Sequence, residues 1–161
     1  MVSVYLSVAP PDGFTKWGEA DWDRWLRDHP WESAERICSR GDWSIFLFQL
    51  RAHADQGKKL VEPLLETLVN ERPLPSLGAE DLKLGLVTAR QELAQKSAAL
   101  LRSQPNNFVG ADDVEHMIKS ARARLGREPT MADVWSDVFE SVDKVLKSAV
   151  EQKRGIYFGN V

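Results

Sequence analysis

The sequence contains one cysteine, Cys38, among its 161 residues. A lone cysteine excludes an intramolecular disulfide, and it excludes a zinc site built from two or more thiolates of one chain. This usage fits a reducing compartment. A thiolate nucleophile needs a depressed pKa and an adjacent base, and His29 is the only histidine near Cys38 in the sequence. We therefore predict a buried, unreactive thiol on the apolar face of a helix.

Long apolar runs and targeting signals are also lacking. A run such as residues 45–48 is far shorter than the roughly 20 residues that a membrane-spanning helix needs. Residues 1–8 have neither the basic region nor the small-residue cleavage site of a signal peptide. The sequence therefore predicts a cytoplasmic protein without a membrane partner.

The chain has no excess of basic residues. Lysine and arginine number 21 against 24 aspartates and glutamates, which gives a formal net charge of -3. Nucleic-acid binding depends on a basic surface that displaces counterions from phosphate, so no nucleic-acid partner is expected. Apolar residues make up 43% and charged residues 28% of the chain, which is typical of a folded globular domain and excludes intrinsic disorder.

Common catalytic and cofactor-binding motifs are missing as well. The sequence has no Gly-x-Ser-x-Gly turn, no Gly-x-Gly-x-x-Gly loop and no phosphate-binding loop. His29, His53 and His116 are far apart and lack the spacing of zinc ligands. No metal and no other cofactor is predicted. A hydrolase or ligand-binding site stays open as an alternative, if carboxylates and His53 converge only in the folded chain.

The first third of the chain carries clear periodic patterns. Residues 2–8 alternate between apolar and polar side chains, which predicts a strand with one buried face. Apolar residues at helical spacing predict a helix over residues 19–28, and a second helix over residues 30–41 with proline in its first turn. Asp42 is predicted to cap a third helix over residues 43–54.

Proline and glycine interrupt the middle of the chain. Residues 61–68 predict an amphipathic helix that can tolerate Pro63 only near its start. Gly85, followed by two β-branched residues, disfavours one long helix in the next segment. We therefore predict a short strand over residues 82–88 and then a helix over residues 89–102.

The last third has the strongest helical signal. One apolar stripe over residues 114–125 predicts a helix that ends at Gly126. Thr130, with an aspartate three residues later, is predicted to cap a helix whose wide apolar face covers residues 134–150. Residues 156–161 predict a closing strand.

Together these patterns predict an α+β fold in a single domain over residues 1–161. The domain is expected to be mostly helical, with a small sheet formed by short N-terminal, central and C-terminal strands. The two terminal strands are expected to lie near each other, and the helix over residues 134–150 is expected to pack across them.

Three segments carry a family resemblance. They are the opening strand VSVYLSVA, the segment over residues 79–100, and the end of the chain, VWSDVFESVDKVLKSAVEQKRGIYFGNV. In these pieces the chain resembles the YfbM-like family of uncharacterised bacterial proteins. The resemblance implies a compact α+β domain and no established activity.

The tryptophans are the unusual feature of the composition. Four of the six lie within fifteen residues and alternate with aspartate and arginine. They are Trp17, Trp22, Trp25 and Trp31. These rings could pack the N-terminal helices onto the sheet, since each can bury up to about 200 Å². They could also form an exposed platform for a partner protein, because tryptophan and arginine are enriched in binding hot spots, or they could line a carbohydrate or small-ligand pocket.

The sequence favours a non-enzymatic protein-interaction module, regulatory or toxin-neutralising. The candidate partner surface consists of Trp22, Arg24, Trp25 and Trp31. The alternative is a small-ligand-binding protein or a hydrolase with a carboxylate and histidine site that forms only in the fold. The two hypotheses differ in whether the tryptophans are exposed and whether the histidines share a cleft.

Overall fold

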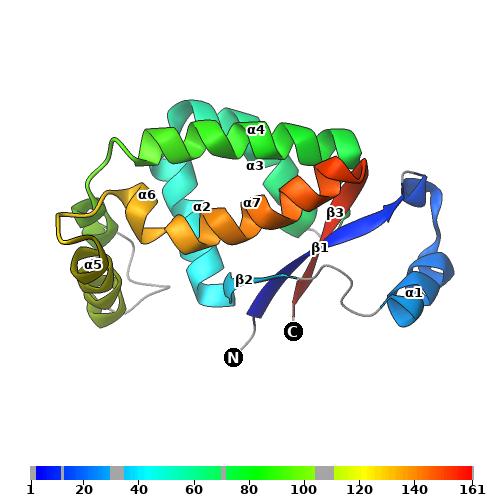
Figure 1. Cartoon of the computed structure of the whole chain (residues 1–161), viewed down its shortest axis with the longest axis horizontal. Helices are drawn as coiled ribbons and strands as arrows, with labels where there is room; N and C mark the ends of the chain where they lie inside the picture. Colours follow the sequence, from blue (N-terminus) through cyan, green and yellow to red (C-terminus); the bar gives the residue numbers. More distant parts are fainter. Residues whose placement is uncertain (1–2, 12, 30–34, 70–71, 104–110, 161) are drawn as a thin grey trace.

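A three-stranded antiparallel sheet brings the two ends of the chain together (Figure 1). The computed structural model describes residues 3–11, 13–29, 35–69, 72–103 and 111–160. The strands are β1 (Ser3–Pro11), β2 (Glu35–Ser39) and β3 (Arg154–Asn160), in the order β2-β1-β3. The first and last strands pair directly, with Val8 opposite Ile156, as the sequence predicts.

Helices make up most of the described chain, so the α+β prediction is confirmed. Short 3₁₀ helices also occur at Phe14–Lys16 and Ala98–Ser103. The α-helices are α1 (Glu19–Asp28), α2 (Arg40–His53), α3 (Asp55–Val69), α4 (Ser76–Leu93), α5 (Ala111–Leu125), α6 (Met131–Val134) and α7 (Ser136–Glu151). No helix among the described residues is both long and apolar enough to cross a membrane.

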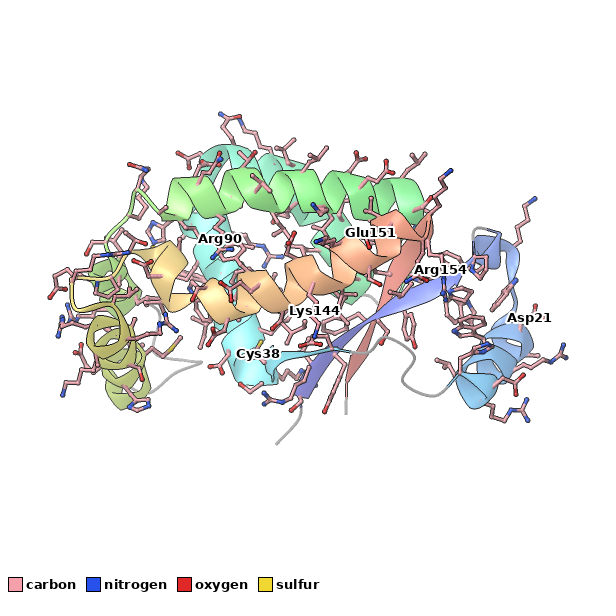
Figure 2. All side chains as sticks on the ribbon, in the orientation of Figure 1. Asp21, Cys38, Arg90, Lys144, Glu151 and Arg154 are labelled. Carbon is pink, nitrogen blue, oxygen red and sulfur yellow. The ribbon has the colours of Figure 1, made fainter. Side chains whose placement is uncertain are left out.

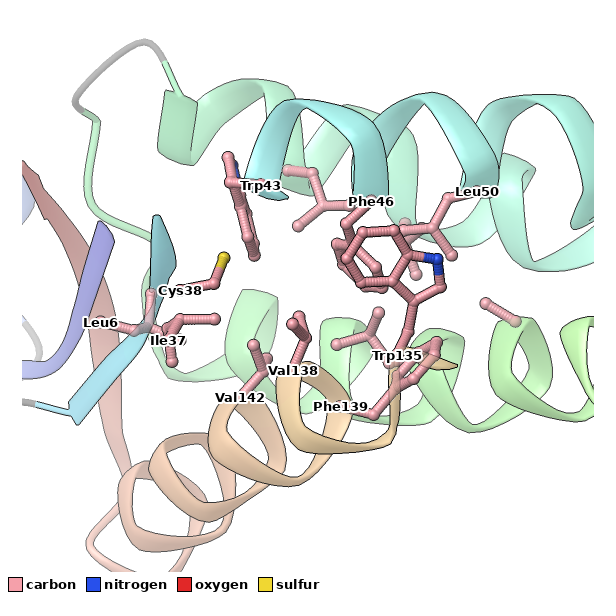
Figure 3. Packing of buried hydrophobic residues seen from close by; sticks show 14 of the residues in the cluster. Leu6, Ile37, Cys38, Trp43, Phe46, Leu50, Trp135, Val138, Phe139 and Val142 are labelled. Carbon is pink, nitrogen blue, oxygen red and sulfur yellow. The ribbon is translucent and has the colours of Figure 1, made fainter. Parts of the chain in front are cut away.

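The hydrophobic core lies between one face of the sheet and the helices. α7 contacts all three strands and packs beside α4 (Figure 1). Val138 and Val142 of α7 point toward Ile37 of β2 (Figure 3). Trp135 and Phe139 meet Phe46 of α2 edge to face, with ring centroids 5.6 and 5.2 Å apart. The predicted packing of the penultimate helix across the terminal strands is therefore confirmed.

The helix predicted over residues 30–41 is wrong. Residues 35–39 form strand β2 instead, and residues 30–34, including Trp31, lie outside the described residues. Val4 pairs with Cys38 and Tyr5 with Arg36, so Ile37 is the extra residue of a β-bulge. The bulge turns the consecutive Ile37 and Cys38 into the core (Figure 3), which imitates helical periodicity in the sequence.

The strand predicted over residues 82–88 is also wrong, because this segment lies inside α4. Gly85 packs so closely on α3 that an added Cβ would lie 2.6 Å from Cγ1 of Val61. Gly57 of α3 makes the same close approach to Ala89 of α4, at 2.5 Å. Glycine here lets two helices approach each other and does not break one. α4 ends at Leu93, well before the predicted end at residue 102.

Two predictions about helix starts and prolines also need correction. Ser39, not Asp42, caps α2, since its hydroxyl accepts a hydrogen bond from the Asp42 backbone N–H at 3.1 Å. Pro63 lies within α3 rather than near its start. Thr67 lies one turn after Pro63 in this helix, and its hydroxyl donates a hydrogen bond to the Pro63 carbonyl at 2.9 Å.

The predicted elements of the last third are present. α5 ends at Leu125, directly before Gly126, whose φ of +68° lies in the left-handed region that glycine adopts without strain. Thr130 and Asp133 form the predicted reciprocal cap, because each side chain accepts a hydrogen bond from the other's backbone N–H, at 3.2 and 2.8 Å. The helix that follows is divided at Trp135 into α6 and α7.

Candidate functional site

Five aromatic rings gather where α1 meets the sheet, and we call them the aromatic cluster: Phe14, Trp17, Trp22, Trp25 and Tyr157. Trp22 is at the centre, with ring centroids 5.6 Å from Phe14, 5.7 Å from Trp17 and 5.9 Å from Tyr157. Trp17 also contacts Trp25 at 6.1 Å. Phe14 is buried, whereas the three indoles and the phenol ring remain partly exposed.

Local sequence explains why the rings share one side of α1. The Gly18 backbone N–H donates to the Asp21 carboxylate at 3.0 Å, which fixes the first turn. Trp22, Trp25 and His29 then follow at spacings of three and four residues, which places them on one helix face. The His29 imidazole stacks on Trp25 with a centroid separation of 3.7 Å and an interplanar angle of 15°. The aromatic face of α1 is therefore held in one arrangement.

The aromatic cluster lies on the face of the sheet opposite the core. Ile156 and Phe158 belong to the core side of β3. Side chains alternate along a strand, so Tyr157 between them points to the other face, where Trp22 meets it. α1 therefore covers only one end of this outer face and lies at the far end of the molecule from α5 (Figure 1).

Charged groups surround the aromatic cluster. The Arg154 guanidinium lies over Trp25, 5.5 Å from the ring centroid, and its Nε donates to the Ala9 carbonyl at 2.6 Å. Figure 2 shows Arg154 beside the side chains that fill the space between the strands and α1. α1 itself carries exposed carboxylates and guanidinium groups on its remaining surface: Glu19, Asp21, Asp23, Asp28, Arg24 and Arg27. α1 by itself is thus net acidic, with four carboxylates against two guanidinium groups.

The predicted partner surface is brought together in part. Trp22 and Trp25 share the cluster, whereas Arg24 is exposed and two residues from Trp22, so it does not face that ring. Trp31 lies outside the described residues. Sequence reasoning missed Tyr157 and Arg154, although the alternation of β3 already places Tyr157 opposite its apolar neighbours.

The remaining described tryptophans take the alternative role of core residues. Trp43 is 5% and Trp135 2% exposed, and both belong to the hydrophobic core. Neither indole N–H finds a hydrogen-bond partner among the described residues. The two predicted roles are therefore divided along the chain, with core tryptophans in α2 and before α7 and partly exposed tryptophans in and before α1.

A second feature is an open groove of about 620 Å³ between α4 and the start of α6. Val87, Arg90, Gln91 and Ala94 of α4 form one wall, and side chains from residues 127–133 form the other. A smaller hollow of about 140 Å³ between α4 and α7 is also lined by Val87 and Arg90. Val87 and Arg90 of α4 therefore border both hollows.

The histidines lie in three separate places. His29 is stacked on Trp25, and His116 is exposed on α5. Burial lowers the pKa of His53 from its ordinary value, and the nearby Lys96 ammonium lowers it further. None of the three lines the groove. Within the described ranges, no three His, Cys, Asp or Glu side chains are grouped as metal ligands would be.

The one cysteine is buried, although on a strand rather than on the predicted helix. Burial raises the pKa of the Cys38 thiol to about 12, and the nearby Asp42 carboxylate adds to the increase. The thiol is therefore protonated at neutral pH, which removes its nucleophilic form.

Comparison with known proteins adds no assignment. No protein-family model, no curated protein and no solved structure matches this chain.

Proposed function

We propose that this chain is a non-enzymatic, cytoplasmic protein-binding module, regulatory or toxin-neutralising, and that the aromatic cluster is its binding surface. The observation that carries the proposal is the state of α1. None of its ten residues is buried, yet it presents Trp22 and Trp25 on one face. Tryptophan that stays partly exposed is typical of interface hot spots, because a partner can bury the rest of a large ring.

The rings are organised before any partner arrives. Each edge-to-face pair in the cluster contributes about 0.5–1.5 kcal/mol beyond burial, so the indoles hold one another in place. Stacking of His29 on Trp25 restrains the last turn of α1 in the same way. A preorganised surface loses little side-chain entropy on binding, which favours affinity.

The charges around the cluster indicate the chemistry of the partner. α1 carries four carboxylates and two guanidinium groups, so a partner with lysine or arginine at its rim is complementary.

The alternative of a hydrolase or ligand site built from histidines and carboxylates finds less support among the described residues. His53 and His116 lie away from the groove, and the Cys38 thiol is protonated. Resemblance to the YfbM-like family stays a hypothesis.

Position-specific photo-crosslinking tests the proposal. A photo-reactive amino acid replaces Leu26, which is 44% exposed on α1, in the full chain expressed in its native cells. The control position is Leu77, which is 72% exposed on α4. We expect a discrete protein adduct from position 26 alone, weakened by salt and lost when Trp25→Ala is added.

Two results would contradict the proposal. One is the same adduct pattern from both positions, which would indicate non-specific collisions. The other is an adduct at position 26 that persists in a folded Trp25→Ala variant. Circular dichroism of each variant before crosslinking separates loss of binding from loss of structure.

A further inference from the structure

The groove beside α4 has the size of a small-molecule site. Its volume of about 620 Å³ lies within the range of roughly 300–1,000 Å³ typical of ligand pockets. Val87, Ala94 and Ala132 supply apolar surface, and Val87 is 49% exposed. The adjoining hollow extends this surface to Leu86 and Phe139 beneath Arg90. The groove lining therefore combines these apolar side chains with five polar or charged ones: Arg90, Gln91, Arg127, Thr130 and Asp133.

Arg90 is the least compensated cation in the groove. Its guanidinium lies 5.5 Å from the Phe139 ring centroid and 3.7 Å from the Glu140 carboxylate. No hydrogen bond joins it to another described residue, although a guanidinium has five N–H donors. Figure 2 shows Arg90 in the space between α4 and α7. Its head is thus positioned over an aromatic ring with its donors available.

The other cation on the groove wall is already neutralised. Arg127 donates to both carboxylate oxygens of Asp133, at 2.8 and 3.3 Å. This two-point contact leaves little of its charge for a ligand. Charge complementarity therefore directs an anionic group to Arg90 rather than to Arg127.

We infer that this groove binds a small organic anion, with its anionic group on the Arg90 guanidinium and its apolar body on Val87, Ala94 and Ala132. Gln91, exposed on the same wall, offers its amide to a further polar group of the ligand. A carboxylate and a phosphate ester share this chemistry. The site is separate from the aromatic cluster, which lies at the other end of the molecule, so the two proposals do not depend on each other.

Amide shifts in ¹H–¹⁵N NMR spectra of the full chain test the inference. The titrants are octanoate and octyl phosphate, with acetate as the anion without an apolar body and 1-octanol as the body without an anion. We expect saturable shifts at Val87, Arg90, Gln91 and Ala94 with at least one of the two anionic octyl compounds. Acetate and octanol are expected to bind at least tenfold more weakly. The stronger octyl compound identifies the anionic group.

Three variants test the residues. Arg90→Gln should weaken binding at least tenfold, which corresponds to about 1.4 kcal/mol. Arg51→Gln is the matched control, because Arg51 pairs with Glu62 at 2.9 Å, outside the groove. Ala94→Phe, at an exposed position, should fill the groove and abolish binding without altering the core.

The inference is overturned if neither octyl compound shifts the groove amides at millimolar concentration. It is also overturned if octanol binds as tightly as octanoate, or if Arg90→Gln keeps full affinity. The NMR spectrum of each variant reports whether it is folded, so a folding defect is not mistaken for a lost contact. Trp25→Ala should leave octanoate affinity unchanged, which distinguishes this site from the aromatic cluster.

Discussion

The close contact between α3 and α4 makes Gly57→Ala a severe test of the packing. A Cβ at position 57 would lie 2.5 Å from both Cα and Cβ of Ala89. Ordinary van der Waals contact begins near 3.4 Å, so the two helices would have to separate by about 1 Å. The atom in the way belongs to the backbone of α4, and no rotamer change can relieve the overlap.

Separation of the helices has a second consequence. The Glu92 carboxylate accepts hydrogen bonds from the backbone N–H groups of Gln56 and Gly57, in the first turn of α3. Movement of α4 would lengthen both, and bonds to charged groups contribute about 1.5–3 kcal/mol. Overpacking itself destabilises the folded protein by about 1–3 kcal/mol, whereas the higher helix propensity of alanine stabilises it by about 1 kcal/mol. We expect a net loss of about 2–3 kcal/mol.

Urea denaturation followed by circular dichroism measures this loss. For a chain of this size, about 2–3 kcal/mol corresponds to a decrease in Tm of about 4–12 °C. Gly41→Ala is the matched control, because the nearest atom to its added Cβ is the Ser39 hydroxyl at 3.9 Å, in the open first turn of α2. That variant should be unchanged or about 0.4–1 kcal/mol more stable. If Gly57→Ala behaves like Gly41→Ala, the close contact between α3 and α4 is refuted.

Two further predictions concern polar groups. Hydrogen bonding to Arg127 lowers the pKa of Asp133 to about 2 from 3.8, so its stabilisation is complete above about pH 4 and is lost as pH falls through about 2. Because the Arg127 side chain is half exposed, we expect the free energy of unfolding to fall by only about 1 kcal/mol as pH decreases from 5 to 2, measured by urea denaturation. This decrease should be absent from Asp133→Asn, which has no carboxylate at position 133 to protonate. It should be present in the control Asp137→Asn. Gln49 is 1% exposed, and its amide finds no partner among the described residues. Gln49→Met should therefore raise the free energy of unfolding by about 1–3 kcal/mol, and a decrease in the same assay would show that the amide is satisfied in solution.

Patterns that depend on local physics were predictable from the sequence. The alternation of β1, the reciprocal cap of Thr130 and Asp133, and the end of α5 at Gly126 each depend on a few neighbouring residues. Pairing of the terminal strands also followed, because each has one apolar face to bury. The aromatic face of α1 was predictable for the same reason.

Features that depend on a second element were not predictable in this way. In the sequence, the neighbouring Ile37 and Cys38 fit the apolar face of a helix. In the structure they lie in β2, where pairing with β1 includes a bulge. Gly85 taken alone predicts a break in the helix, whereas in the structure it lies inside α4 and allows close contact with Val61 of α3. In both cases one local pattern is compatible with two structures, and the partner element decides between them.

The groove shows why an error in one element can conceal a site. Arg90 belongs to α4, and the ring that holds its guanidinium, Phe139, belongs to α7. A strand over residues 82–88 interrupts α4 and breaks the helical register that places Val87, Arg90, Gln91 and Ala94 along one wall. The glycine that caused this error also allows α4 to lie close against α3 as one continuous helix. The packing that misleads local reasoning at Gly85 is therefore part of what positions Arg90 across from α7.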